Sequence, residues 1–282
     1  MDSAWITGAV GLIGNYLVQT AAPFAPTWQV IGLTRGQPDL TDFAAVRRAF
    51  RGRRPQLIVH CAALSTSPAC QANPALARKL NVDVTTCLAE LAADIPFIFF
   101  SSDLVFDGRI GNYDESAQPN PLSVYAETKT LAEQIVLSNS KHTVIRASLN
   151  GGTSPTGDRG FNEEMRCAWQ AGQPLKLFTD EFRSPIPAVA TARAVWELVA
   201  QNQPGLYHLA GSERLSRWQI GQLLAARWPQ LDRRLEPCSI IDYSGPPRSP
   251  DTSLNCAKIQ RRLSFPLPGL GEWLKTNPNE PF

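Results

Sequence analysis

Short apolar runs alternate with amphipathic segments of helix length through the first two hundred residues of the chain. Several of the runs are apolar throughout, as expected for strands buried on both faces of a sheet. The pattern predicts strands at 4–7, 29–34, 57–61, 97–101, 143–146 and 206–209, and helices at 11–20, 40–50, 74–93, 124–138 and 189–201. We therefore expect an α/β fold with a doubly wound parallel sheet that helices cover on both faces.

The alternation loosens after about residue 150, and the Pro-rich stretch 242–250 predicts a long surface loop. We expect residues 1–150, together with about 186–210, to form the sheet domain. Residues 151–282 would mostly form a smaller lobe packed against it. Ligand clefts often form at such a junction.

The composition narrows the class of protein. The 282 residues carry a net charge of +2 and are 43% hydrophobic and 18% charged, which favours a folded core over disorder. This balance gives no electrostatic reason to expect a nucleic-acid or membrane partner. No stretch reaches the roughly 18 to 20 apolar residues that span a bilayer, and the N-terminus lacks the pattern of an export signal. We expect a soluble cytoplasmic protein.

The cysteine pattern agrees with that expectation. None of the six cysteines is spaced as a CxxC pair, so the sequence suggests neither a zinc site nor a disulfide framework. We expect reduced thiols and no bound metal. The cysteines are Cys61, Cys70, Cys87, Cys167, Cys238 and Cys256.

A glycine-rich turn stands between the first predicted strand and the first predicted helix. Its glycines are Gly8, Gly11 and Gly14, and the helix opens through Leu12 and Ile13. Glycines let the backbone approach a pyrophosphate closely, and the helix N-terminus offers free N–H groups to phosphate. The spacing G-x-x-G-x-x-G differs from the G-x-G-x-x-G fingerprint. A dinucleotide site is the interpretation, and a tight turn without a ligand is its alternative.

The residues at the ends of the second and third predicted strands indicate which cofactor would bind. An acid after the second strand would bind an adenosine ribose hydroxyl, whereas Arg35 stands there and would accommodate a 2′-phosphate. This favours NADP(H) over NAD(H), unless Arg35 is simply a solvated surface charge. The third strand ends in the small residues Cys61, Ala62 and Ala63, which leave room for a cofactor. We expect His60 to be a strand residue with a satisfied ring.

Three polar residues form a candidate catalytic group. Ser102 follows the fourth strand, and Tyr125 and Lys129 share a face of the next helix. An adjacent ammonium would lower the pKa of the phenol and make Tyr125 a general acid. The Ser102 hydroxyl would hydrogen-bond a carbonyl oxygen that gains negative charge. A tyrosine and a lysine at this spacing also occur on ordinary helices, so the case depends on the whole set.

These motifs resemble those of the extended short-chain dehydrogenase/reductase superfamily. The resemblance is sharper to the dTDP-4-dehydrorhamnose reductase family. It rests on Asp-Leu-Thr-Asp at 39–42, Ser-Ser-Asp-Leu-Val-Phe-Asp-Gly at 101–108, Tyr-Asp-Glu at 113–115 and Asn-Pro-Leu-Ser-Val-Tyr at 120–125. Segments 144–148, 205–211 and 248–254 are similar to later parts of that family, so the likeness runs nearly end to end.

The resemblance implies a Rossmann-type fold and assigns roles to residues. Ser102, Tyr125 and Lys129 match the family's triad, with Lys129 also holding the nicotinamide ribose. The three glycines match its pyrophosphate turn, and the walls of its cofactor site match the segments containing Asp39, Leu40, Ala62 and Ala63. Two loops depart from the family, at 64–71 and at Leu149, where the family has an aromatic residue.

Taken together, the sequence predicts NADPH-dependent reduction of a keto-sugar nucleotide, with Tyr125 as proton donor. One alternative is a nucleotide-sugar epimerase or dehydratase, which the missing acid after the second strand disfavours. Another is a non-catalytic NADP-binding regulatory protein like the methionine adenosyltransferase β subunit, which the intact triad disfavours. The sugar, the nucleotide and the oligomeric state stay open, with a homodimer among the alternatives.

Overall fold

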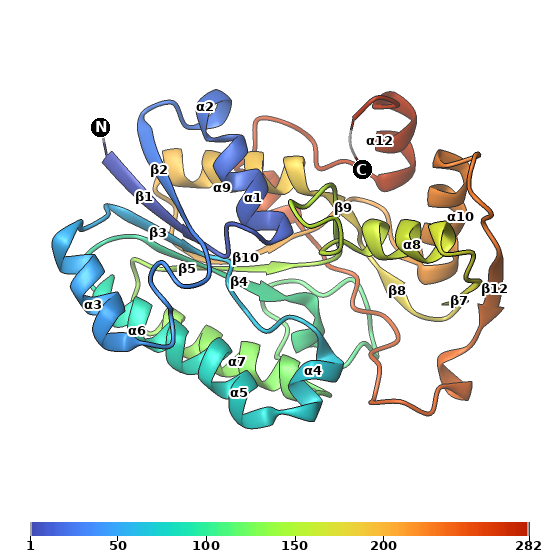
Figure 1. The fold of residues 1–282 in the computed structure, drawn as a ribbon, viewed down its shortest axis with the longest axis horizontal. Helices are drawn as coiled ribbons and strands as arrows, with labels where there is room; N and C mark the ends of the chain where they lie inside the picture. The colour runs from blue at the N-terminus through green and yellow to red at the C-terminus, as the bar shows by residue number, and fades with distance from the viewer. Residues whose placement is uncertain (1, 281) are drawn as a thin grey trace.

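A six-stranded parallel sheet lies at the centre of the computed structural model, which describes residues 2–280 and 282 (Figure 1). The strands, in the order in which they lie side by side, are β2 (Trp28–Leu33), β1 (Asp2–Thr7), β3 (Leu57–His60), β4 (Phe97–Ser102), β5 (Thr143–Ala147) and β10 (Gly205–Leu209). All neighbouring pairs are parallel. The predicted α/β fold and all six predicted strands are confirmed.

The chain places β2 on one side of β1 and then adds β3 and the later strands on the other side. β1 pairs with β2 on one side and with β3 on the other, so β2 is the edge strand. The usual dinucleotide-binding order continues beyond β2 with a third strand, whereas here the third strand crosses back to β1. In both orders the crevice opens at the carboxyl ends of the strands where the direction reverses.

Helices cover both faces of the sheet, as the sequence predicts (Figure 1). α1 (Leu12–Gln19) and α9 (Ala188–Gln201) pack on one face through an apolar cluster that includes Leu17 and Trp196. α3 (Phe43–Gly52), α6 (Val84–Leu91) and α7 (Val124–Leu137) cover the other face through a second cluster. The central strands are buried on both sides, which explains why their sequences are largely apolar.

Two predicted helices differ from the structure. The helix expected at 40–50 begins at Phe43, because the Asp42 side chain caps it by accepting from the Ala45 N–H at 2.9 Å. The helix expected at 74–93 is α5 (Pro74–Arg78), a π-helical turn (Lys79–Asp83) and α6 in succession. A π-helical turn adds one residue, and a 3.6-residue periodicity does not reveal it.

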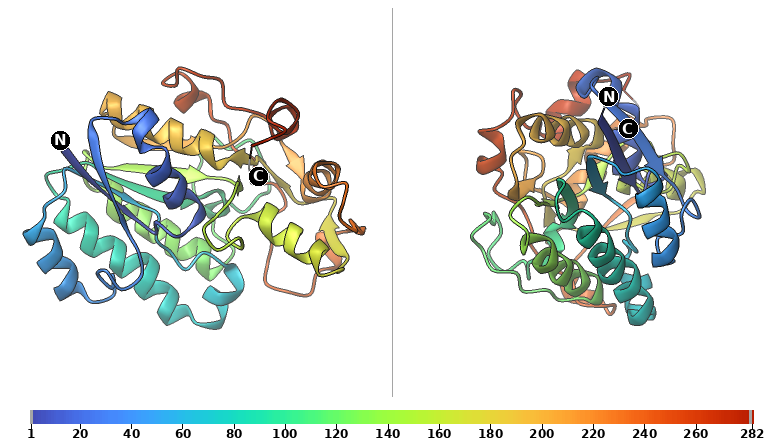
Figure 2. Two further views of the ribbon diagram at one scale, coloured as in Figure 1. Left: turned by 45° about the horizontal axis from the view of Figure 1, so that its top comes forward. Right: turned by 90° about the vertical axis from the view of Figure 1, so that its left-hand side faces the viewer.

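Helices and strands of the C-terminal third lie beyond the carboxyl ends of the sheet strands (Figure 2). They form most of a third apolar cluster. It gathers α8 (Phe161–Gln170), α10 (Arg217–Arg227) and α12 (Leu270–Thr276) around the parallel pair β7 (Leu175–Phe178) and β12 (Leu235–Cys238). The sequence did not locate these elements. The predicted Pro-rich loop follows a short 3₁₀ turn, Ile240–Asp242.

The remaining elements are short connections. They are α2 (Ala21–Phe24), α4 (Ser67–Ala72), the 3₁₀ turn Asp103–Val105, β6 (Asn150–Gly151), β8 (Phe182–Arg183), β9 (Ile186–Pro187), β11 (Leu215–Ser216) and α11 (Ala257–Gln260). Among the helices of residues 2–280 and 282, none is both long enough and apolar enough to cross a membrane.

Candidate functional site

A cavity of about 1210 Å³ runs along the carboxyl edge of the sheet and continues between the sheet and the C-terminal third. It brings together nearly all the residues that the sequence singled out. Lining it are Gly8, Gly11, Leu12, Ile13, Gly14, Arg35, Asp39, Leu40, Cys61, Ala62, Ala63, Ser102 and Tyr125. Lys129 is buried in α7 and is not part of the lining.

The glycine turn is shaped by close backbone contacts. Gly8 has φ +68°, and a Cβ on it would lie 2.8 Å from the Ala62 nitrogen. A Cβ on Gly14 would lie 2.3 Å from the Gly8 oxygen, so neither position has space for a side chain. The first turn of α1 follows directly, and the first N–H groups of a helix have no partner within the helix. The turn therefore forms a cradle suited to an anion.

Thr7 and His60 fix the strand ends beside this cradle. The Thr7 Oγ1 accepts hydrogen bonds from the Cys61 and Ala62 N–H groups, both at 3.2 Å, and lies 2.7 Å from His60 Nδ1. His60 Nε2 lies 3.2 Å from Thr85 Oγ1. Burial and the nearby Lys129 charge lower the pKa of His60 to about 3, so the ring is neutral. The predicted satisfied ring is confirmed.

Arg35 and Asp39 stand at the exposed rim of the cavity, beyond the end of β2. Asp39 accepts hydrogen bonds from the N–H and the hydroxyl of Thr41, both at 2.9 Å. These bonds hold the pKa of Asp39 below its ordinary value. The carboxylate is thus engaged by its own turn, whereas Arg35 is exposed and lines the cavity.

Tyr125 is buried in the first turn of α7 and is only 8% exposed. Burial raises the pKa of Tyr125, hydrogen bonding with Ser102 opposes the rise, and the charge of Asp103 adds to it. The expected lowering of this pKa was wrong: the net shift is upward, because desolvation of the buried phenol outweighs the other influences. The phenol is therefore protonated at neutral pH.

Lys129 shares the face of α7 that carries Tyr125, and its side chain is 4% exposed. Its Nζ lies 4.3 Å from the centroid of the Phe99 ring. Burial lowers the pKa of Lys129 to about 8. Ser101 also lines the cavity, and its buried Oγ has no hydrogen-bond partner among the described residues.

Sequence reasoning missed Asn81, which lies in the π-helical turn and is 1% exposed. Its side chain accepts from the Leu64 N–H at 2.8 Å and donates to the Leu64 oxygen at 3.1 Å and to Thr128 Oγ1 at 3.0 Å. It thereby joins the loop after β3 to the helix that carries Tyr125. The only sequence signal for this role of Asn81 was a polar residue at a position where the apolar pattern of the predicted helix calls for a buried side chain.

Sequence reasoning also missed an arginine cluster at the far end of the cavity. The carboxylate of Glu181, which is fully buried, pairs with Arg183 at 2.9 Å, with Arg217 at 3.3 Å and with Arg248. Burial raises the pKa of Glu181, but the Arg248 hydrogen bond and the other two charges outweigh it and lower the pKa. The side chains of Arg217 and Arg248 keep exposed fractions of 24% and 29%, so both can reach a ligand in the cavity.

The geometry supports acid catalysis next to an anion site. A protonated phenol can donate its proton to an oxygen in the cavity, and the Ser102 hydroxyl can hydrogen-bond the same oxygen. At the other end, three guanidinium groups are shared by two carboxylates, Glu181 and Asp103, which leaves a net positive charge. The arrangement suits a ligand with a carbonyl group at one end and an anionic group at the other.

Comparison with known proteins gives similar chains of several kinds. The methionine adenosyltransferase 2 subunit beta of Xenopus laevis is 28% identical over 274 residues, covering 92% of this chain and 81% of that one. The probable low-salt glycan biosynthesis reductase Agl14 of Haloferax volcanii is 27% identical, covering 95% and 94%. The solved dTDP-4-dehydrorhamnose reductase of Bacillus anthracis, in complex with NADP, has a TM-score of 0.89 at 20% identity, covering 98% of each chain.

A family model matches almost the whole chain. It is described as the RmlD substrate binding domain and covers residues 3–277. This match, together with the structural likeness to dTDP-4-dehydrorhamnose reductases, confirms the resemblance inferred from the motifs. The protein therefore belongs to the RmlD substrate binding domain family.

Proposed function

We propose that the protein reduces the ketone of a keto-sugar nucleotide with NADPH. The observation that carries this proposal is a single cavity, which the glycine cradle, Ser102, Tyr125 and the arginine cluster all line. These parts would hold a dinucleotide, the reacting carbonyl and a diphosphate in one continuous space. The volume of about 1210 Å³ is large enough for two ligands of nucleotide size.

The residues at the sheet edge fit a nicotinamide dinucleotide. The cradle around Gly8 and Gly14 would receive its pyrophosphate, and Arg35 would face a 2′-phosphate. Lys129 would hold the nicotinamide ribose, as the resemblance to the family implies, and it would do so from behind the cavity wall. When bound, the cofactor supplies the hydride. The NADP in the structure of the Bacillus anthracis reductase supports the choice of cofactor.

The chain's own residues handle the proton. Tyr125 donates its phenolic proton to the carbonyl oxygen as negative charge develops there, and its raised pKa keeps it in the acid form. Ser102 hydrogen-bonds the same oxygen and orients it. The Lys129 ammonium, buried one turn along α7, stabilises the phenolate that remains after the transfer.

The arginine cluster would bind the diphosphate of the substrate. Arg217 and Arg248 line the cavity, and guanidinium groups recognise phosphate oxygens through paired hydrogen bonds. Glu181 holds both side chains beside each other and lowers the cost of ordering them. The nucleotide would therefore lie toward the C-terminal third, and the sugar would point toward Tyr125.

The direct test is turnover with a panel of dTDP-, UDP- and GDP-linked 4-keto sugars, following NADPH oxidation. We expect at least one of them to be reduced, with an activity that Tyr125→Phe removes. Epimerases and dehydratases return their cofactor unchanged, so net NADPH oxidation separates them from a reductase. Tight NADPH binding with no oxidation on any member of the panel would contradict the proposal.

A second candidate function is regulation by contact. The similarity to methionine adenosyltransferase 2 subunit beta favours it, at 28% identity over most of both chains. Such a protein would bind NADPH and a partner without turning over. Copurification with a methionine adenosyltransferase catalytic subunit, together with an inactive panel, would support this function instead.

A further inference from the structure

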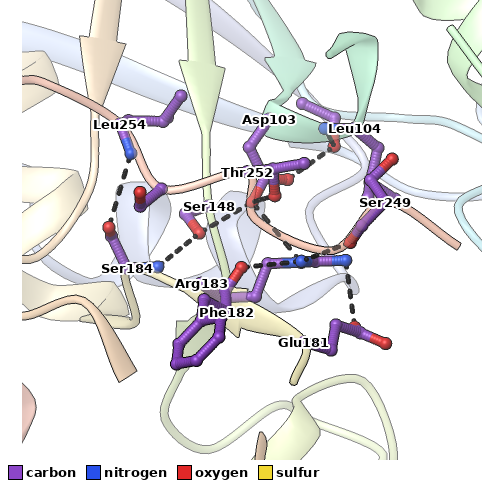
Figure 3. A network of polar contacts seen from close by, with 12 residues as sticks. Asp103, Leu104, Ser148, Glu181, Phe182, Arg183, Ser184, Ser249, Thr252 and Leu254 are labelled. Atoms are coloured by element: carbon purple, nitrogen blue, oxygen red, sulfur yellow. Dashed lines mark hydrogen bonds and ion pairs between the residues drawn. The ribbon is translucent and has the colours of Figure 1, made fainter. Parts of the chain in front are cut away.

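A buried carboxylate adjoins the proposed catalytic serine and has no role in the mechanism above. Asp103 follows Ser102 at the end of β4 and is 5% exposed. Its two oxygens have separate partners, and those of Oδ2 are labelled in Figure 3. Oδ1 lies 3.2 Å from the Ser102 Oγ and accepts its hydrogen bond. The Leu104 N–H donates to that same Oγ at 3.1 Å, so Asp103 and Leu104 together fix the position of the serine oxygen.

The other carboxylate oxygen is tied to distant parts of the chain. Oδ2 accepts hydrogen bonds from the Ser148 hydroxyl at 2.8 Å and from the Thr252 hydroxyl at 2.9 Å. It also faces Arg183 Nε at 3.9 Å. Ser148 follows β5, whereas Thr252 belongs to the C-terminal segment 249–254. Asp103 is therefore the point where the sheet edge and that segment meet.

The surrounding hydrogen bonds leave this junction little freedom (Figure 3). Arg183 Nη1 donates to the Phe182 oxygen at 2.7 Å and to the Ser249 oxygen at 3.0 Å, and Nη2 pairs with Glu181. The Thr252 N–H donates to the Phe182 oxygen at 3.2 Å. Buried polar groups whose partners are all satisfied hold one arrangement, because breaking any bond leaves an unpaired group.

We propose that Asp103 is a positioning residue that holds the Ser102 oxygen in place, and that Thr252 and Ser148 hold Asp103 in place. The single Ser102 proton points to Asp103 in the structure and would turn to the carbonyl oxygen when a substrate binds. A carboxylate turns about one bond, so two hydroxyls fixed on Oδ2 also fix Oδ1. The C-terminal segment thereby contributes to the reacting end of the cavity without touching the substrate. This inference rests on the proposed reductase function, in which Ser102 binds the carbonyl oxygen.

The first test measures the effect of each substitution on kcat in two proteins, the wild type and Ser102→Ala. We expect Asp103→Asn to lower kcat by about tenfold or more and Thr252→Val by several-fold, since a small misplacement of a catalytic group is costly. The KM for NADPH should change less than twofold. In a Ser102→Ala background both substitutions should cost less than twofold, because the group they position is gone. Equal losses with and without Ser102 would overturn the proposal.

A matched control uses another threonine. Thr276 is exposed in α12, and its hydroxyl bonds only within that helix, to the Glu272 oxygen at 3.0 Å and the Trp273 oxygen at 3.3 Å. We expect Thr276→Val to leave kcat unchanged in both backgrounds. If Thr276→Val lowered kcat as much as Thr252→Val does, the loss would be a general effect of replacing threonine by valine. This result would also contradict the proposal.

A second test needs no turnover and uses urea unfolding. We expect Thr252→Val and Asp103→Asn each to lower the urea midpoint, and the double variant to lower it by clearly less than the sum. Thr276→Val should instead be additive with Asp103→Asn. If no keto-sugar nucleotide is reduced, the proposed function fails while this measurement still tests the junction. If the shifts in urea midpoint caused by Thr252→Val and Asp103→Asn were strictly additive, the proposal would be contradicted.

Discussion

The surroundings of Tyr125 determine its protonation state. Burial and the Asp103 charge raise its pKa, and the Ser102 hydrogen bond only partly opposes them. The phenol is therefore protonated at neutral pH, which is the form that can donate a proton, but the rise also makes it a weaker acid. Reduction of a ketone starts from this protonated form, whereas oxidation of an alcohol starts from the phenolate.

Removing the phenolic oxygen tests that role. Tyr125→Phe keeps the ring and its packing but removes the proton donor, so kcat should fall by roughly 10² or more. The dissociation constant for NADPH should change little and can be measured by fluorescence titration. A variant that retained near wild-type turnover would show that another group donates the proton.

The lowered pKa of Lys129 predicts how kcat depends on pH. Its pKa is lowered to about 8, so the ammonium is charged below that pH and loses its charge above it. We expect kcat to fall as pH rises through about 8, because the neutral amine no longer stabilises the phenolate. Lys129→Arg, which stays charged, should move this fall to higher pH. An identical pH profile in the two proteins would rule out Lys129 as its source.

Arg35 determines the expected cofactor preference. NADPH should bind at least several-fold more tightly than NADH, because a guanidinium at the end of β2 can meet the 2′-phosphate. Arg35→Ala should reduce the preference by weakening NADPH binding alone. Equal dissociation constants of the wild-type protein for NADPH and NADH would remove the basis for this assignment.

At the scale of elements, the turn between β1 and α1 depends on the absence of side chains. Gly14→Ala would place a Cβ 2.3 Å from the Gly8 oxygen and force the turn open. We expect NADPH affinity to fall at least tenfold. Gly52→Ala is the control, since nothing lies within 4 Å of its Cβ at the end of α3. If Gly14→Ala bound NADPH as well as Gly52→Ala does, the turn would not be the cofactor cradle.

Local sequence predicted the elements that carry local signals. The strands of the sheet were found because each is a short apolar run, and the glycine turn because its spacing stands between a strand and a helix. The boundaries of α3 and the π-helical turn were missed, because a capping Asp42 and one extra helical residue leave no trace in apolar periodicity.

Residues brought together from distant segments could not be predicted in this way. Glu181, Arg217 and Arg248 meet only because β8, α10 and the loop after the 3₁₀ turn Ile240–Asp242 converge. Asp103 and Thr252 are 149 positions apart. The pKa direction of Tyr125 was misjudged for the same reason, since its burial depends on packing that the sequence does not state.

At the scale of the molecule, the six thiols differ in access. Cys167 is exposed and the other five are buried or partly buried. We expect one thiol to react quickly with a maleimide in the native protein and all six to react after denaturation without reductant. Mass spectrometry counts the modified cysteines. A native disulfide, seen as two cysteines that stay unmodified after denaturation, would contradict the expected reduced state.

The whole account depends on hydride reaching a sugar carbon in this cavity. The most direct measurement is mass spectrometry of the sugar product after turnover with NADPH that carries deuterium at both C4 positions of the nicotinamide. We expect one deuterium in the product sugar, together with one equivalent of NADP⁺, and neither with Tyr125→Phe at the same enzyme concentration and time. Conversion of a keto-sugar nucleotide without deuterium in the product would contradict the central claim, as would a panel on which no conversion occurs.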